Sequence, residues 1–376
     1  MRENVMKTVA ILIPALNPDR RLLAYVQNLV TYGFHKILII DDGSNEEAKS
    51  IFSDIASFGG EETDITILEH AVNLGKGRAL KDGINYYLTH LKDQYKDCYG
   101  VITVDSDGQH HIEDVIRVSE ALALTMNKRL VLGCRDFDLD FIPFKSKFGN
   151  KLTKVVFRFC FGTDVKDTQT GLRGFTNALL PDLLELYGER FEYETNVLIE
   201  CVKKEVDLEQ ITIQTIYENG NEGTHFDPIR DSVKIYRLIL KRFFSYVAAS
   251  FSSSLIDCAI FQLLCIFLPF ADMPRIYAAT VGARIISSLY NYTINKNVVF
   301  KSRANGKKSL LQYYLLCILT MIVSGTAVNL LYAVVKKGEL VMKCIVDTIL
   351  FFCNYHIQQK YVFAEKKNCG ERNDTV

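Results

Sequence analysis

Short apolar runs alternate with segments of helical periodicity through the first 230 residues of the chain. The runs are rich in Ile and Val and end at polar or glycine-containing turns, which is typical of buried β-strands. We expect strands at residues 8–14, 36–40, 65–69 and 101–104, and helices at 22–30, 46–58, 79–91 and 195–203. Because strands and helices alternate, the pattern predicts an α/β domain with a mainly parallel, doubly wound sheet.

Long apolar segments replace this alternation after residue 246. Each of the four is about long enough to cross a bilayer as a helix. They occupy residues 247–268, 276–299, 310–335 and 340–363. We therefore expect an α/β domain at 1–229, an interfacial amphipathic helix or linker at 230–245, an all-α four-helix transmembrane domain at 246–365 and a basic, polar tail at 366–376.

Two stretches combine basic and apolar residues at helical spacing. One is 144–161, where Phe148, Leu152 and Val155 recur on one face and lysines occupy another. The other is 230–245, whose basic face consists of Arg230, Lys234, Arg237 and Lys241. Helices of this kind lie in anionic membrane interfaces, although a surface helix packed on a sheet is the alternative for either stretch alone.

The chain has no net charge, with 44 Lys and Arg against 44 Asp and Glu. From Val247 onward, however, 14 basic residues stand against 7 acidic ones. A basic, apolar part joined to an acidic part indicates a membrane partner rather than nucleic acid. The ten cysteines form no C-x-x-C pair and no zinc-ligand spacing, so we expect free thiols in a reducing compartment.

Polar side chains follow three of the expected strands at the point where each strand ends. Asn17 follows the first, Asp41 and Asp42 follow the second, and Asp105 and Asp107 follow the fourth. Taken singly, each motif could be a turn or a helix cap. Parallel sheets bind ligands at the carboxyl ends of their strands, so the combination favours a ligand site at this edge.

These motifs resemble those of family 2 glycosyltransferases with the GT-A fold, over about residues 9–236. The resemblance rests on PALN at 14–17, DDGS at 41–44, NLGKG at 73–77, DSDGQH at 105–110, GCR at 133–135 and DTQTG at 167–171. The last motif, followed by Arg173, is similar to the branch that transfers sugars to polyprenyl phosphates, such as dolichol-phosphate mannosyltransferase. The resemblance implies a Rossmann-like GT-A catalytic domain at 1–229.

The resemblance also implies a role for each motif residue. The sugar nucleotide is expected on Pro14, Ala15, Leu16, Asn17, Asp41, Asp42, Lys76, Asp105 and Ser106, with either Asp41 or Asp42 facing the base. A divalent ion, Mg²⁺ or Mn²⁺, is expected on the oxygens of Asp107 and Gln109, which are spaced to point from one side of their loop. The acceptor or its phosphate is expected on Arg135, Gln169, Thr170, Arg173 and His225. Catalytic roles are expected for Asp105, Asp107, Arg135 and Arg173, while His110 and His111 are expected to cap or orient the loop.

The acceptor determines whether a general base is needed. A lipid phosphate is already anionic at neutral pH, whereas a sugar hydroxyl must be deprotonated. We expect a single displacement with inversion, in which the metal stabilises the leaving pyrophosphate. Glu192 and Glu194 lie where the family places an acidic pair, but they could equally form the first turn of a helix. The loop at 217–226 lacks the basic residues of mannosyl-transferring relatives, which argues against mannose and leaves His225 and Arg230 as the cations there.

The apolar segments resemble the GtrA-like four-helix membrane family. The matching stretches are Asp257, ARIIS at 283–287, NYTIN at 291–295 and the VVF and YVF sequences that end the second and fourth segments. Charges deep in a bilayer are costly, so we expect Asp257 and Arg284 to form an ion pair, with a snorkelling Arg284 as the alternative. Basic residues at 301–308 and 366–372 predict a multi-pass protein with its catalytic domain in the cytoplasm.

We therefore expect an inverting hexosyltransferase that uses a UDP- or GDP-sugar and an undecaprenyl or dolichyl phosphate, for cell-envelope or glycan assembly. The expected partners are the donor, the lipid and the membrane, with homo-oligomerisation left open and no nucleic acid. One alternative is that the membrane domain also translocates the lipid-linked sugar. A processive polysaccharide synthase is disfavoured, because its Gln-x-x-Arg-Trp motif needs tryptophan and the chain has none.

Overall fold

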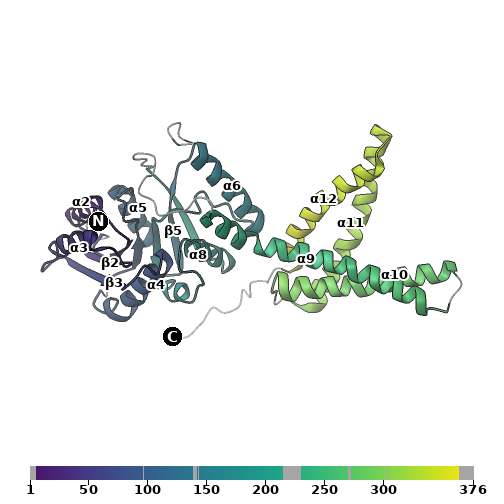
Figure 1. Cartoon of the computed structure of the whole chain (residues 1–376), viewed down its shortest axis with the longest axis horizontal. Coiled ribbons are helices and arrows are strands. Elements are labelled where there is room, and N and C mark those ends of the chain that lie inside the picture. Colours follow the sequence, from purple (N-terminus) through teal and green to yellow (C-terminus); the bar gives the residue numbers. More distant parts are fainter. Residues whose placement is uncertain are drawn as a thin grey trace. The chain divides into compact units, whose positions relative to one another are not determined.

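The computed structural model describes residues 6–95, 97–138, 142, 144–214, 230–269, 272–302 and 304–363. The chain divides into two compact units, Met1–Ile239 and Leu240–Val376. Strands and helices alternate in the first unit, whereas the described part of the second unit contains helices (Figure 1).

A seven-stranded sheet forms the centre of the first unit, in the order β3-β2-β1-β4-β6-β5-β7. The strands are β1 (Val9–Ala15), β2 (Lys36–Asp41), β3 (Asp64–Glu69), β4 (Gly100–Thr103), β5 (Arg129–Arg135), β6 (Arg173–Thr176) and β7 (Asp207–Ile213). Only β6 runs antiparallel to its neighbours, β4 and β5. The predicted α/β class with a mainly parallel sheet is confirmed.

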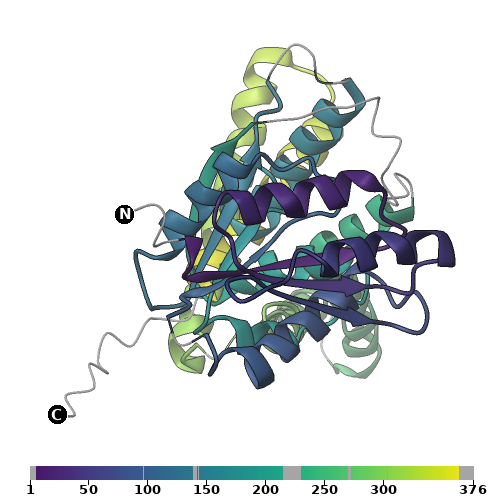
Figure 2. The same ribbon diagram turned by 90° about the vertical axis from the view of Figure 1, so that its left-hand side faces the viewer.

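Alternation along the strands gives the sheet two apolar faces, with helices on both sides (Figure 2). The helices are α2 (Arg20–Thr31), α3 (Glu46–Ala56), α4 (Lys76–Tyr86) with the π-helical turn η1 (Tyr87–Leu91), α5 (Ile112–Leu122), α6 (Phe144–Phe161), α7 (Leu180–Leu184) and α8 (Glu192–Lys203). Ile11 and Ile13 pack with α2, α3 and α5 in one core. On the other face, a Cβ on Gly83 would lie 2.4 Å from Leu12 Cδ1, so α4 approaches β1 more closely than an alanine would allow.

The carboxyl ends of β1, β2 and β4 meet at one edge of the sheet. In the register of β1 and β2, Ala15 lies opposite Asp41. The backbone N–H of Asp42 donates to the Ala15 carbonyl at 2.8 Å, and that of Val104 donates to the Leu12 carbonyl at 3.1 Å. The polar motifs that follow these three strands therefore begin side by side.

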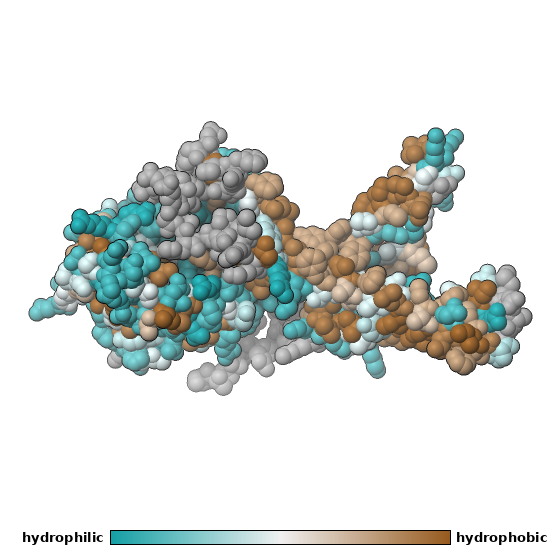
Figure 3. Space-filling view, viewed as in Figure 1, coloured by the Kyte–Doolittle hydropathy of each residue, from teal (hydrophilic) through white to brown (hydrophobic). Residues whose placement is uncertain are grey.

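The second unit is built from long helices. These are α9 (Arg230–Phe267), α10 (Asp272–Ile294), α11 (Gly306–Val335) and α12 (Glu339–Ile357), with the π-helical turns η3 (Asn295–Val299) and η4 (Gln358–Val362) continuing α10 and α12. Among the described residues, three helices are long and apolar enough to cross a membrane: Ile235–Phe267, Gly306–Val335 and Leu340–Val362. Apolar residues cover much of their visible surface (Figure 3). The second predicted span, 276–299, is helical, but α10 is not among these three.

Two predicted interfacial stretches are helical. Residues 230–245 are not a separate element, since α9 continues through them for 38 residues into the first predicted span. The stretch 144–161 is α6, in which Phe148, Leu152 and Val155 are largely exposed. Their placement at a membrane surface stays a prediction.

Candidate active site

The loop after β4 carries the two carboxylates on which the predicted site depends. β4 is buried along its whole length. Beyond it, Asp107 Oδ1 accepts a hydrogen bond from the Gln109 backbone N–H at 3.0 Å, and Gly108 takes a φ of 72°. Glycine adopts this left-handed conformation without a Cβ clash, so the chain can turn tightly here. The turn holds the Asp107 carboxylate at the mouth of the sheet edge.

Lys76, at the start of α4, bridges two carboxylates from different elements. Its ammonium lies 2.7 Å from Asp105 Oδ1 and 3.0 Å from Glu194 Oε2. Glu194 is buried in the first turn of α8. The bridge thus joins the loop after β4 to α4 and α8, and loss of Lys76 would leave two neighbouring carboxylates without their shared cation. The predicted contact of Lys76 with the nucleotide stays a prediction.

The two loop carboxylates differ in their electrostatic surroundings. Burial opposes the ionisation of Asp105, but the Lys76 ammonium and the His110 ring hold the pKa of Asp105 well below its usual value. Burial and the negative charge of Asp105 raise the pKa of Asp107. Asp105 is therefore charge-compensated by the protein, whereas Asp107 is a carboxylate that an added cation would stabilise.

The two histidines of the motif have the predicted structural roles: His110 contacts Asp105 in the loop, and His111 caps α5. His110 is buried, and its Nε2 lies 3.2 Å from Asp105 Oδ2. His111 is the N-cap of α5, where its Nδ1 accepts from the Glu113 backbone N–H. Both oxygens of Asp105 thus have protein partners, one on Lys76 and one on His110.

Gly171 brings the DTQTG motif against the carboxylate loop. A Cβ at this position would lie 2.1 Å from Asp105 Oδ2. Gly171→Ala should therefore displace Asp105 and lower the sugar-transfer rate by about a hundredfold, since a misplacement of about 1 Å can have that effect. The matched control is Gly149→Ala on α6, where a Cβ meets nothing within 4 Å. Initial rates with saturating donor test this, and equal rates for the two variants would contradict it.

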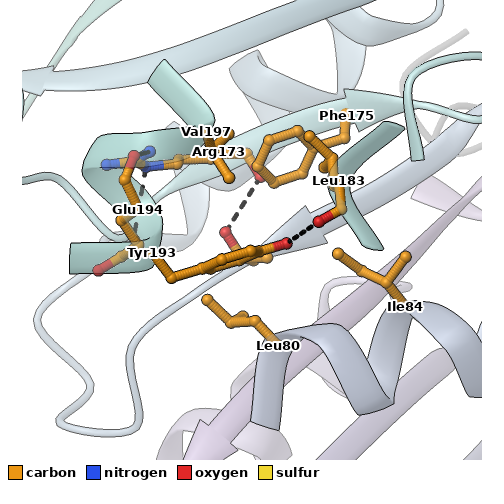
Figure 4. Close-up of a pocket in the computed structure, with 9 residues that line it drawn as sticks. Leu80, Ile84, Arg173, Phe175, Leu183, Tyr193, Glu194 and Val197 are labelled. Atoms are coloured by element: carbon orange, nitrogen blue, oxygen red, sulfur yellow. Dashed lines mark hydrogen bonds and ion pairs between the residues drawn. The ribbon is translucent and has the colours of Figure 1, made fainter. Parts of the chain in front are cut away.

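Arg173 lies beneath the site rather than open to solvent. Its guanidinium is 1% exposed and donates to three backbone carbonyls, those of Thr170, Glu194 and Thr168. Figure 4 shows it beside Glu194 at the end of a small cavity of about 10 Å³, lined mainly by apolar side chains from α4, α7 and α8. These contacts are those of a residue that positions the 168–170 segment. Its predicted phosphate contact stays a prediction.

The acidic pair at the start of α8 divides into two environments. Glu194 contacts Lys76, whereas Glu192 Oε1 accepts from the backbone N–H groups of Glu189 and Arg190. Glu194→Gln should lower kcat by about tenfold to a hundredfold, because Lys76 and Asp105 lose their alignment. Glu192→Gln keeps an acceptor oxygen and should retain nearly full kcat. Measured kcat values in the reverse order would refute this division.

Arg135, at the end of β5, forms an ion pair with Asp167, the first residue of the DTQTG motif. Arg135 Nε and Nη2 lie 2.8 Å and 3.2 Å from the two Asp167 oxygens, a bidentate arrangement. Asp167 is fully buried and also accepts from Asn150 Nδ2 and two backbone N–H groups. Burial opposes its ionisation, yet Arg135 holds the pKa of Asp167 below the usual value. The Arg135 side chain remains 29% exposed, so one side of the guanidinium faces outward.

Asn17, Asp41 and Asp42, which are predicted to bind the nucleotide, form hydrogen bonds and ion pairs with the loops around them. Asn17, with a φ of 46°, donates its backbone N–H to Ser44 Oγ, and its Oδ1 accepts from the Asn45 N–H. Asp41 accepts from the Ser44 N–H and pairs with Lys49. Asp42 accepts from the Leu74 and Gly75 N–H groups and contacts His70. Asp42 therefore fixes the loop that precedes α4, and through it the position of Lys76.

The remaining predicted residues fall into three groups. Pro14, Ala15 and Leu16 close the end of β1 beside Asp41. Ser106 is half-buried in the carboxylate loop, Gln169 is exposed and Thr170 is buried. His225 and the loop at 217–226 lie outside the described residues, and so does the side chain of Arg230.

The donor set at the loop suits a divalent cation bound with a phosphate ligand. Within the described parts of the chain, no three His, Cys, Asp or Glu side chains are grouped to hold a metal ion. Mg²⁺ is commonly held by one or two carboxylates while substrate phosphates supply further oxygens. Asp107, with its raised pKa, and Gln109 two residues later provide hard oxygen ligands of that type. The residues therefore fit Mg²⁺ or Mn²⁺.

Sequence reasoning missed two residues that organise the site. Asp167 opens the DTQTG motif, and the sequence does not indicate that it is the buried partner of Arg135. The sequence does not distinguish Glu194 from Glu192, whereas in the structure only Glu194 pairs with Lys76 among the described contacts of the two. A carboxylate within a polar motif was the available signal for both, but its partner lies far away along the chain.

The predicted ion pair of the second unit is confirmed. Arg284 Nη2 lies 3.4 Å from Asp257 Oδ2, and Ser287 Oγ donates to the other Asp257 oxygen at 2.7 Å. The predicted alternative, an Arg284 without a protein partner, is wrong.

Comparisons with known sequences cover both units. Residues 10–174 match the family described as Glycosyl transferase family 2, and residues 245–363 match GtrA/DPMS, transmembrane domain. An uncharacterized protein of Methanocaldococcus jannaschii is 28% identical over 240 residues, which cover 63% of this chain and 93% of that protein. UDP-N-acetylglucosamine–dolichyl-phosphate N-acetylglucosaminyltransferase of Methanococcus voltae is 27% identical over 62% of this chain and 96% of its own length. Glycosyltransferase AglJ of Haloferax volcanii is 26% identical over 62% of this chain and 71% of its own length.

Proposed function

We propose that this chain, a glycosyltransferase with a family 2 glycosyltransferase domain followed by a GtrA/DPMS transmembrane domain, moves a hexose from a UDP- or GDP-sugar to a polyprenyl phosphate. The proposal rests on one observation: the same chain contains both a loop with two carboxylates at the sheet edge and helices able to cross a membrane. The relative named for transfer to dolichyl phosphate supports the same class of acceptor.

The proposed reaction is a single displacement. An oxygen of the lipid phosphate forms a bond to the anomeric carbon, while the bond from that carbon to the nucleoside diphosphate breaks and its electron pair leaves with the diphosphate. Attack opposite the leaving group inverts the configuration. A divalent ion held by Asp107 and Gln109 would supply charge neutralisation for the diphosphate. Lys76 and His110 keep Asp105 ionised and fix its orientation in the loop.

The state of Glu194 supports an acceptor that needs no deprotonation. Glu194 is buried and shares the Lys76 ammonium with Asp105, with its Oε2 3.0 Å from Lys76 Nζ. A carboxylate engaged by an ammonium in this way is not free to contact an acceptor hydroxyl as a general base. A phosphate acceptor requires none, because it is already anionic at neutral pH.

The catalytic unit is proposed to act at the cytoplasmic face of the membrane. Basic residues after η3 and in the first turn of α11, such as Lys301, Lys307 and Lys308, support that orientation under the positive-inside rule. If α9, α10, α11 and α12 each cross the membrane, the number of crossings is even. The chain after α12 would then lie on the same side of the membrane as the catalytic unit.

Incubation of membranes with a panel of labelled UDP- and GDP-sugars tests the proposal. Label from one donor should enter a lipid that mild acid cleaves to sugar and polyprenyl phosphate. Membranes that contain the Asp107→Asn variant serve as the background. Label found only in polymer or in water-soluble products would contradict the polyprenyl-phosphate acceptor.

A further inference from the structure

The membrane unit contains an internal repeat. The sequence NYTINKNVVF at 291–300 recurs as NYHIQQKYVF at 354–363, with a spacing of 63 residues. Both copies end a helix in a π-helical turn, η3 and η4. The first helices correspond at a spacing of 67 residues, which places Tyr246 opposite Tyr313 and Asp257 opposite Ser324. We call α9 with α10 the first hairpin and α11 with α12 the second hairpin.

The structure shows that the repeat is also a repeat in space. Residues at equivalent positions of α10 and α12 are buried alike: Ala279 and Met342, Ala283 and Val346, Asn295 and Gln358, Val299 and Val362. Ring pairs across the hairpins also match, with Tyr246–Tyr355 centroids 5.2 Å apart and Tyr313–Tyr292 centroids 5.6 Å apart. Asn295 donates to its own counterpart, Gln358, at 3.2 Å. These matched positions and contacts indicate a pseudo-two-fold relation between the two hairpins about the Asn295–Gln358 contact.

Equivalent positions of the two hairpins carry opposite charges. Arg284 and Asp347 each lie eleven residues before the π-helical turn, at about 16 Å along the helix. Each contacts the equivalent residue of its own hairpin, Asp257 in the first and Ser324 in the second. Yet the Arg284 side chain is 74% exposed and that of Asp347 is 48% exposed. The hairpins thus present an arginine and an aspartate at matching depth.

Exposed charges at this depth require a cover. Charged side chains within membrane-spanning segments face the protein interior or one another, because hydrocarbon solvates them poorly. On the second hairpin, one face of α12 forms a shallow open groove beside Asp347, lined by Lys343, Asp347, Thr348, Phe351 and other α12 residues. Asp347 pairs with Lys343 at 2.9 Å but stays half-exposed, so this face can accept the projecting Arg284 as a further cation.

We propose that a second copy of this chain covers both faces in the membrane, with Arg284 of each copy in the groove beside Asp347 of the other. A two-fold axis along the membrane normal preserves depth, so it brings the two positions together twice in one closed dimer. Asp257, Arg284 and the partner's Asp347 and Lys343 then form a row of alternating charges without a net charge. This inference rests on the membrane unit and is independent of the sugar or the acceptor.

Charge exchange tests the proposal on the full-length protein in lipid nanodiscs. The wild type should have the mass of a dimer by native mass spectrometry. Arg284→Glu and Asp347→Lys should each lower the dimer association constant at least about tenfold, because each places like charges together. The double variant, with both changes, should recover the dimer because the contact between the copies regains opposite charges, although the like charges at 257 and 284 and at 343 and 347 within each copy should keep the association constant below that of the wild type. Lys337→Glu, an exposed charge at the α11–α12 connection, should remain dimeric.

Two results would overturn the proposal. One is a wild type that is monomeric. If that monomer carries a bound phosphate-bearing lipid and Arg284→Glu does not, Arg284 binds a lipid rather than a second copy of the chain. The other is a double variant that stays monomeric while circular dichroism shows a melting temperature equal to that of the wild type. Rates of sugar transfer measured in parallel keep this outcome separate from a failure of the proposed reaction.

Discussion

Replacing Asp167 with alanine should lower the melting temperature of the catalytic unit by about 10 °C. Asp167 is fully buried and accepts five hydrogen bonds, two of them from the Arg135 guanidinium. Removal of one partner of a buried ion pair typically costs about 3–5 kcal/mol, because the remaining charge is uncompensated. For a unit of this size about 1 kcal/mol corresponds to about 2–4 °C. Circular dichroism of the full-length protein in detergent would measure the change.

Two further variants control this prediction. Arg135→Met should destabilise at least as much as Asp167→Ala, because it leaves the fully buried Asp167 carboxylate without its cation, whereas Asp167→Ala leaves an arginine side chain that is 29% exposed. Asp164→Asn removes a nearby exposed carboxylate that pairs with Lys154 at 3.5 Å, and it should change stability by less than about 0.5 kcal/mol. An Asp167→Ala protein as stable as the Asp164→Asn protein would show that the pair contributes nothing.

The same pair gives the catalytic unit a pH dependence with a definite sign. The pKa of Asp167 is lowered in the folded state, so the folded protein binds its proton less readily than the unfolded chain. Its contribution to stability is therefore complete above the unfolded pKa of about 3.9 and is lost as the pH falls below it. Between pH 5 and pH 3 the wild type should lose more stability than Asp167→Asn, which has no carboxylate to protonate.

Four of the seven strands could be predicted because their signal is local, whereas β5, β6 and β7 were not among the predicted strands. Each of the four predicted strands lies within one residue of its observed position, since an apolar run bounded by turn residues needs no partner to be recognised. The meeting of Asn17, Asp41 and Asp105 at one edge followed from the parallel order alone. Register and antiparallel insertion of β6 were not predictable in this way, because they depend on contacts between distant segments.

The charges of the site could be predicted only as members of a motif. Lys76 was predicted to contact the nucleotide, but its two described partners are Asp105 and Glu194, 29 and 118 residues away along the chain. Arg173 has the chemistry of a phosphate ligand, but its guanidinium is buried against three backbone carbonyls. This burial depends on the position of β6 between β4 and β5, which the sequence does not predict. Residue type indicates what a group can do, whereas the fold determines which partner it meets.

The membrane unit shows the opposite relation between sequence and structure. The repeat of NYTINKNVVF and NYHIQQKYVF can be read directly in the printed sequence. Its consequence could not be, because the pseudo-two-fold axis depends on which rings and amides meet across the hairpins. The confirmed Asp257–Arg284 pair was predictable because two charges in neighbouring apolar segments have few other partners.

Replacing Asp107 with asparagine should lower sugar transfer by up to about a thousandfold, the largest effect on activity that the site predicts. Neutralising the developing charge on a leaving group is commonly the largest single contribution to catalysis, and loss of one such contact costs about a hundredfold to a thousandfold. Asparagine is nearly isosteric and can still accept the Gln109 N–H, so the turn should be kept. Only the negative charge is removed.

Donor binding gives this prediction a readout that does not depend on turnover. Titration calorimetry of the full-length protein with the preferred nucleotide sugar should show that Mn²⁺ strengthens binding to the wild type and has little effect on Asp107→Asn. Asp54→Asn, on the exposed face of α3, should behave as the wild type in both assays. Asp107 is the carboxylate whose pKa burial and Asp105 raise, while Lys76 and His110 already compensate Asp105. If Asp107→Asn and Asp54→Asn show equal Mn²⁺ dependence of donor binding, Asp107 is not a metal ligand. The metal-binding role proposed for the 105–109 loop would then be wrong.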